Sequence, residues 1–151
     1  MADTRLLSAG PLEVLKQDHD RIRTHFRTHA QTPVDQTAVR DELFREIRRE
    51  LRVHGMIERD HVYPVLNGTS PGLADDHVAI EGLLDKLAAM SSGDKSYDAL
   101  MKLLEENVAL HAAAEERVLF PRLERLSPLA AYELTIQLEN ARDRFWRAEP
   151  D

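Results

Sequence analysis

Apolar residues recur at intervals of three and four along most of the chain, which is the spacing of one face of an α-helix. We therefore predict five helices, over residues of about 11–28, 33 (or 35) to 63, 71–90, 95–120 and 128–147. Their expected buried faces, in order, are Leu12, Leu15, Ile22 and Phe26; Val39, Leu43, Ile47 and Leu51; Leu73, Ile80, Leu84 and Leu87; Leu100, Leu104 and Val108; and Leu134, Leu138, Ala141 and Phe145.

Proline punctuates these segments. Pro11, Pro33, Pro71 and Pro128 each follow a residue suited to a helix N-cap, and we expect them to begin helices. Proline inside a helix removes a hydrogen bond and clashes with the preceding turn, so Pro64 and Pro121 are expected to end helices. Asp94 is a possible cap in the turn at 91–94.

A motif occurs twice. His54 is followed by Glu58, Tyr63-Pro64 and Leu66, and the same spacing joins the residues His111, Glu115, Phe120-Pro121 and Leu123. The upstream segments repeat as well, because Asp18-His19 with Ile22 corresponds to Asp76-His77 with Ile80. Each half of the chain therefore carries one His followed by a His-x-x-x-Glu.

The turns predict that the four motif histidines meet. In an up-down bundle, residues of adjacent antiparallel helices lie at equal height when the turn is midway between them. The midpoints of successive pairs among His19, His54, His77 and His111 fall near residues 36, 66 and 94, each in or beside a predicted turn. We predict an all-α, up-down-up-down four-helix bundle over about 11–123, with an additional helix outside it, in one domain of residues 1–151.

Buried imidazoles without partners cost several kcal/mol each, roughly, and a bound metal ion converts that cost into binding free energy. The glutamate four residues after a histidine shares its helix face. Seven candidate ligands result, too many for one ion: His19, His54, Glu58, His77, Glu81, His111 and Glu115. Nitrogen and oxygen donors without sulfur suit iron or manganese better than structural zinc.

With these motifs, residues 12–123 resemble a hemerythrin-like (HHE cation-binding) domain. The resemblance implies a non-haem centre of two iron ions with an oxo or hydroxo bridge. It further implies that Glu58 and Glu115 bridge the irons, with His19 and His54 on one iron and His77 and His111 on the other.

The resemblance to oxygen-carrying hemerythrins implies His-x-x-x-His on the third helix and His-x-x-x-x-Asp on the fourth. This chain departs from that pattern. Here these helices read His77-x-x-x-Glu81 and His111-x-x-x-Glu115. A third carboxylate would lower the charge of a ferric centre from about +2 to about +1, which favours the ferric state over the diferrous state of a carrier. We expect the iron at His19 and His54, which has fewer protein ligands, to hold the open position.

The expected function is turnover of hydrogen peroxide, dioxygen or nitric oxide by a catalase-like or other di-iron oxidoreductase. The alternative is oxygen or iron binding, storage or sensing without catalysis. The net charge of −7 argues against a nucleic-acid partner, and the absence of cysteine excludes disulfides and thiolate ligands. No segment approaches the ~20 apolar residues of a membrane span. We expect a cytoplasmic monomer or homodimer, in which Phe145 and Trp146 pack the last helix or a dimer contact.

Other histidines and one tyrosine are weaker candidates. His61 is expected on the ligand face about 10 Å beyond His54, where it lines or fills the bundle mouth. His25 and His29 are expected in solvent. Tyr63 should point away from the bundle axis, unless Pro64 distorts the last turn and brings it to the site.

Charged neighbours of the ligands have two interpretations. Asp18 and Asp76 either hydrogen-bond a ligand imidazole or are ordinary charged residues. Glu116 is expected at the surface or in contact with a ligand. Arg23, which replaces Glu81 in the first repeat, is either an exposed residue or an inward cation paired with a carboxylate of the site.

Overall fold

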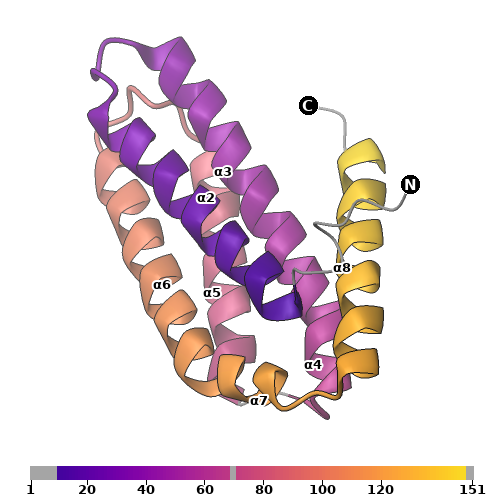
Figure 1. Cartoon of the computed structure of the whole chain (residues 1–151). Helices are drawn as coiled ribbons and strands as arrows, with labels where there is room; N and C mark the ends of the chain where they lie inside the picture. Colours follow the sequence, from indigo (N-terminus) through magenta and orange to yellow (C-terminus); the bar gives the residue numbers. More distant parts are fainter. Residues whose placement is uncertain (1–9, 69–70, 149–151) are drawn as a thin grey trace.

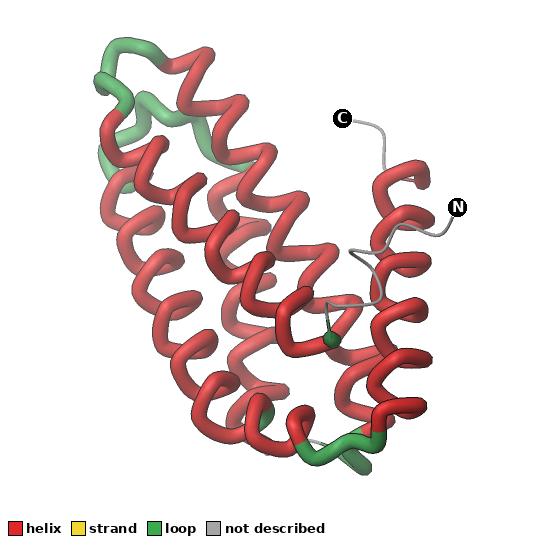
Figure 2. Tube along the Cα trace, in the orientation of Figure 1, coloured by secondary structure: helices red, strands yellow, loops and turns green. Residues whose placement is uncertain are grey.

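The computed structural model describes residues 10–68 and 71–148, and all regular elements in these ranges are helical (Figures 1 and 2). The elements are α2 (Pro11–Gln31), α3 (Thr37–Ile57), the π-helical segment η1 (Glu58–Val62), α4 (Tyr63–Val65), α5 (Pro71–Ala88), α6 (Tyr97–Val118), α7 (Phe120–Glu124) and α8 (Pro128–Ala148). Helices α2, α3, α5 and α6 form the bundle, and α8 stands outside it (Figure 1). The predicted all-α bundle with an additional C-terminal helix is confirmed.

The bundle is built from two helical hairpins. Helix α2 packs against α3, and α5 packs against α6, so each half of the sequence repeat forms one hairpin. The two hairpins meet where α3 contacts α5, and α8 packs on the outer side of α2 and α3. None of the described helices is long and apolar enough to cross a membrane.

The buried apolar residues form two clusters at different heights. The upper cluster, at the end of the 32–36 and 89–96 turns, contains Ile22, Phe26, Phe44, Ile47, Leu51, Ile80, Leu83, Leu84, Leu87, Tyr97, Met101 and Leu104. The lower cluster contains Val14, Leu15, Val53, Ile57, Val62, Tyr63, Leu66, Leu73, Leu119, Phe120, Leu123, Leu134, Leu138 and Ala141. The last three place the apolar face of α8 in the lower cluster, as predicted.

One predicted face, that of α3, needs correction. Val39 on α3 is 47% exposed, and the buried residues there are Arg40 and Phe44, one position further along. One nitrogen of the Arg40 guanidinium pairs with Asp98 on α6, which gives a charged partner to a cation that hydrophobic periodicity would place outside.

Helix boundaries follow the prolines only in part. Pro11 follows Gly10 at the start of α2, and the Ser127 hydroxyl accepts a hydrogen bond from the Ala130 amide at the start of α8. Pro33 lies in a turn, because α3 begins four residues later, at Thr37. Asp94 accepts from the Ser91 amide within its turn and does not cap α6. Ser70, the predicted cap before Pro71, lies outside the described residues.

Pro64 does not end its helix. The chain widens into η1, where the Tyr63 amide donates to the Glu58 carbonyl five residues back. The wider turn makes room for the proline ring, which would otherwise clash with the carbonyl four residues earlier. The helical path ends instead at Asn67 and Gly68, whose φ values of 58° and 102° suit an asparagine and a glycine. Pro121 lies in α7, just after α6 ends at Val118.

His29 is not in solvent, contrary to the prediction. Its side chain is buried on α2, and a hydrogen bond of 2.8 Å joins its Nε2 to the hydroxyl of Tyr97 on α6. Burial lowers the pKa of His29, so the imidazole is neutral. This hydrogen bond ties the first hairpin to the second at the upper end of the bundle.

Replacing Tyr97 with phenylalanine should destabilise the protein. Tyr97→Phe leaves a buried imidazole nitrogen without a partner, which costs about 1–3 kcal/mol. Urea denaturation should show this loss, whereas Tyr132→Phe on the exposed surface of α8 should change the unfolding free energy by less than about 0.5 kcal/mol. Equal stabilities of the two variants would contradict the role given to the His29–Tyr97 contact.

Candidate metal centre

Each bundle helix brings one buried histidine to the level between the two apolar clusters: His19 from α2, His54 from α3, His77 from α5 and His111 from α6. The predicted layer is therefore present. Two pairs form within it, because the ring centroids are 4.9 Å apart for His19 and His54 and 4.6 Å apart for His77 and His111. Each pair belongs to one hairpin.

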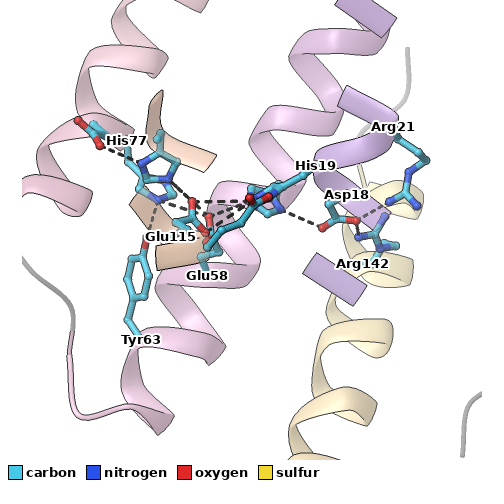
Figure 3. A network of polar contacts seen from close by, with 12 residues as sticks. Asp18, His19, Arg21, Glu58, Tyr63, His77, Glu115 and Arg142 are labelled. Carbon is cyan, nitrogen blue, oxygen red and sulfur yellow. Dashed lines mark hydrogen bonds and ion pairs between the residues drawn. The ribbon is translucent and has the colours of Figure 1, made fainter. Parts of the chain in front are cut away.

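Two carboxylates, Glu58 and Glu115, stand between the histidine pairs (Figure 3). Glu58 Oε1 lies 3.0 Å from His54 Nε2 and 3.5 Å from His77 Nε2, so it reaches both hairpins. Glu115 contacts His111 Nε2 and lies 3.9 Å from His19 Nε2. Donor atoms close enough to share an ion form two groups: Glu58, His77, His111 and Glu115; and His19, His54 and Glu115.

The donor atoms fit a cation. Glu58 and Glu115 are both 0% exposed, and none of their four oxygens has a hydrogen-bond donor in suitable geometry. His111 Nε2 is likewise buried without a hydrogen bond. Burial of such an atom costs roughly several kcal/mol in lost hydration, and no hydrogen bond within the protein offsets this cost. A positive ion among them would supply the missing partner.

The protonation pattern shows the same attraction for positive charge. Burial lowers the pKa of His19 and of His77 to about 4. Burial acts in the same direction on His54, but the adjacent Glu58 carboxylate outweighs it and raises the pKa well above the usual value. Burial and the charge of Glu58 together raise the pKa of Glu115. Burial would raise the pKa of Glu58, but the charge of His54 outweighs it and lowers the pKa well below its usual value. The centre therefore retains protons on Glu115 and His54, where it could bind a cation, and metal binding must displace them.

A model of the hemerythrin HHE cation binding domain matches residues 10–123, and a second match covers residues 69–147. The chain belongs to the hemerythrin HHE cation-binding family. Membership identifies a metal-binding, all-helical protein, and the predicted resemblance is confirmed.

Relatives of this HHE domain come from mycobacteria. The chain is 28% identical over 112 residues to an uncharacterized protein of Mycobacterium tuberculosis and to one of Mycobacterium bovis, which covers 72% of this chain and 69% of each relative. It also resembles the crystal structure of a hemerythrin HHE cation binding domain-containing protein from Mycobacterium kansasii, with a TM-score of 0.83 and 23% identity over 93% of this chain and 89% of that chain. This likeness shows a shared fold.

The aspartates that precede two of the histidines orient the others. Asp18 lies 2.9 Å from Nδ1 of His54, and Asp76 lies 3.0 Å from Nδ1 of His111. Each aspartate thus acts across its hairpin and not on its own neighbour in sequence. A carboxylate at Nδ1 fixes the tautomer in which Nε2 is available to a metal. Of the two interpretations given to these residues, hydrogen bonding to an imidazole is the one observed.

The repeated aromatic-proline pairs serve the opposite hairpin. The Tyr63 hydroxyl is 2.8 Å from Nε2 of His77, and Phe120 stacks on His19 with centroids 5.8 Å apart. Tyr63 reaches His77 because η1 adds a residue to the turn and rotates the following chain by about 100°. Tyr63 was expected to reach the site only if the last helical turn near Pro64 is distorted. The helix is distorted there, and Tyr63 reaches the site.

The same rotation moves His61 away from the bundle axis, and its side chain lies in a surface hollow with residues of α8 such as Asn140 and Arg144. The expectation that His61 lies on the ligand face or at the bundle mouth is wrong.

Glu116 contacts His19 Nδ1 at 3.3 Å and pairs with Arg23, an exposed residue of α2. Sequence reasoning had left both outcomes open for these two residues.

Glu81 is not brought into either group. It is half-buried on α5, one turn beyond His77, and lines a cavity beside the site. Its role as a ligand stays a prediction.

Gly55 was not predicted to matter. A Cβ atom at this position would lie 3.1 Å from Nδ1 of His77 and 3.2 Å from the Arg59 guanidinium, so a glycine lets α3 pass close to His77. The signal for Gly55 in the sequence was its position directly after a histidine of the repeated motif. The second copy of the motif has Ala112 at the equivalent position, so the repeat itself did not point to a glycine.

Helix α8 also contributes to the centre. Asp18 is 1% exposed and is held by Arg142 from α8 and by Arg21 from its own helix (Figure 3). These two guanidinium groups stabilise the carboxylate that orients His54. A chain of contacts therefore runs from the outer helix to the HHE donor set.

Asp18→Asn should weaken metal binding. The amide cannot reproduce the charged acceptor at His54 Nδ1, and loss of such a partner typically lowers metal affinity about 10–100-fold. Competition with a chelator, monitored by metal content, measures the change. Asp20→Asn is the matched control, because Asp20 is exposed on the same helix and contacts Arg23. Equal affinities of the two variants would contradict the orienting role of Asp18.

Proposed function

We propose that this HHE domain holds two iron ions and turns over small oxidants, namely hydrogen peroxide, dioxygen or nitric oxide. The observation that carries the proposal is the pair of donor groups that share Glu115. The proposed ligands are His19, His54, Glu58, His77, His111 and Glu115.

The donor chemistry supports iron. Four imidazoles and two carboxylates, without sulfur, match the ligands of di-iron proteins built inside helical bundles. Glu115 belongs to both groups, and Glu58 stands within 3.5 Å of a histidine from each hairpin, so both carboxylates are positioned to bridge. Two metal positions account for all six buried donors, whereas one position would leave several without a partner.

The two positions differ in the number of protein donors. The group at His77 and His111 offers four, and the group at His19 and His54 offers three. A ligand from outside would bind where the protein supplies fewer donors, which favours the His19–His54 side. All four histidines of the layer line the adjacent cavity, so the position at His19 and His54 is accessible from it.

Bound iron would supply the electrons exchanged with the oxidant. The protein residues would orient and protect the centre. Asp18, Asp76 and Glu116 hold the imidazoles from behind, so that their Nε2 atoms face inward. The lower apolar cluster limits access of bulk water from its end of the bundle, and the Tyr63 hydroxyl offers a hydrogen-bond donor on the His77 side.

Iron content tests the proposed centre. The purified protein should bind two irons per chain, and Glu115→Gln should lose at least one, because it removes charge from the carboxylate common to both groups. Glu106→Gln, on an exposed position of the same helix, should retain both irons. Zinc as the tightly bound native metal, or unchanged iron in Glu115→Gln, would contradict the proposal.

Peroxide is the first substrate to try, because its conversion to water and dioxygen needs no external electron donor. The iron-loaded protein should evolve oxygen from peroxide, as measured with an oxygen electrode, and Glu115→Gln should lose most of this activity. A di-iron protein that leaves peroxide unchanged and binds dioxygen reversibly would favour the oxygen-binding alternative.

Glu81→Gln distinguishes six ligands from seven. If Glu81 is a ligand, as the sequence predicts, this variant should lose one iron or shift the iron absorption bands. Retention of two irons and of the optical spectrum of the wild-type centre would leave the six residues of the two donor groups as the ligands.

A further inference from the structure

A cavity of about 500 Å³ extends from the histidine layer along the side of the bundle between α2 and α6. His19, His54 and His111 lie at its inner end, and its wall on α2 continues to Gln31. Twelve residues of helix correspond to about 18 Å, so the cavity is elongated. His77 also lines it, so the cavity reaches histidines of both pairs.

The cavity is much larger than the small oxidants require. A water molecule occupies about 30 Å³ in the liquid, and peroxide or dioxygen is of comparable size. The volume of about 500 Å³ falls in the range of pockets that enclose organic ligands, roughly 300–1,000 Å³. Access for peroxide or dioxygen therefore does not explain the volume of the cavity.

The walls are mainly apolar. Ile22 and Phe26 from α2 face Leu51, Ile80 and Val108 from the other three helices. Water in such a space has few hydrogen-bond partners, so its replacement by hydrocarbon is favourable.

The charged residues of the cavity balance one another. Arg23 and Arg27 on α2 oppose Glu81 on α5 and Glu105 on α6. Arg23 is already paired with Asp20 and Glu116. The entrance therefore selects neither a carboxylate nor an ammonium group.

We propose that the cavity binds a neutral, apolar organic molecule with one end at the metal centre. The molecules that reach the centre then include neutral organic compounds besides small oxidants. This inference rests on the proposed function in one respect, namely that the inner end of the cavity is a metal centre.

A series of ligands with one chain length tests the proposal. Calorimetric titration of the iron-loaded protein with 1-octanol should show saturable binding of one molecule per chain. Octanoate and octylammonium should bind at least tenfold more weakly, because their charged groups lose solvation without gaining a partner. Octanol should also shift the optical bands of the iron, as expected for a ligand adjacent to the centre.

Matched variants locate the site. Ala109→Trp places an indole at the entrance on α6 and should weaken octanol binding at least tenfold. Ala99→Trp, on an exposed position of α6 away from the cavity, should bind octanol as the wild type does. If Ala109→Trp does not fold, Ala30→Trp on the opposite side of the entrance provides the same test.

Several outcomes would overturn the inference: no saturable octanol binding, tighter binding of either charged analogue, or unchanged affinity in the tryptophan variants at the entrance. The proposed function is judged separately, by iron content and peroxide turnover. If the purified protein binds octanol but does not bind iron, the di-iron proposal alone is contradicted. A di-iron protein that turns over peroxide and does not bind octanol would contradict the inference alone.

Discussion

Glu58 and Glu115 are buried side by side at the centre of the bundle, and much of the structure depends on how this negative charge is accommodated. Two carboxylates without solvent or hydrogen-bond donors would oppose folding by several kcal/mol, roughly. Four imidazoles surround them, and the pKa of Glu115 is raised so that it can retain a proton. The centre interrupts the hydrophobic core, which is therefore divided into an upper and a lower cluster. Metal binding and folding are coupled through these residues.

The sequence repeat becomes a pair of hairpins that support one another. Each hairpin supplies two histidines and one central carboxylate, and its terminal aromatic residue packs against a histidine of the other hairpin. Neither hairpin alone can complete the donor set or bury its inner face. This exchange explains why the aromatic-proline pair recurs together with the His-x-x-x-Glu, although the sequence alone did not assign it a partner.

The helices and the histidine layer could be predicted because they depend on periodicity and loop length, which one sequence displays directly. The failures have local physical causes. Just before Pro64, over Glu58–Val62, the backbone is π-helical, and a strict 3.6-residue period misplaces the residues after Glu58, including His61 and Tyr63. Arg40 and His29 are buried because each finds a polar partner on α6, and such pairs are not visible in hydrophobic periodicity. The Arg142–Asp18 contact joins residues 124 positions apart, so only the tertiary structure reveals it.

The asymmetry between the two halves is not confined to Glu81. Glu81 breaks the repeat in sequence, but it stands outside the donor groups. Within the centre, the two halves differ at two pairs of equivalent positions, namely Tyr63 and Phe120, and Asp18 and Asp76. The His54 side is held by an aspartate that is 1% exposed and bound to α8, whereas the aspartate at His111 has a side chain that is 45% exposed. On the other helix of each hairpin, the aromatic residue that contacts His19 is Phe120, which presents an apolar ring, whereas His77 is contacted by the hydroxyl group of Tyr63. The position at His19 and His54 thus combines a rigid support from behind with fewer protein donors than the other position, and both of its histidines line the cavity. A site with these properties can admit a neutral ligand without first removing a protein group from the metal.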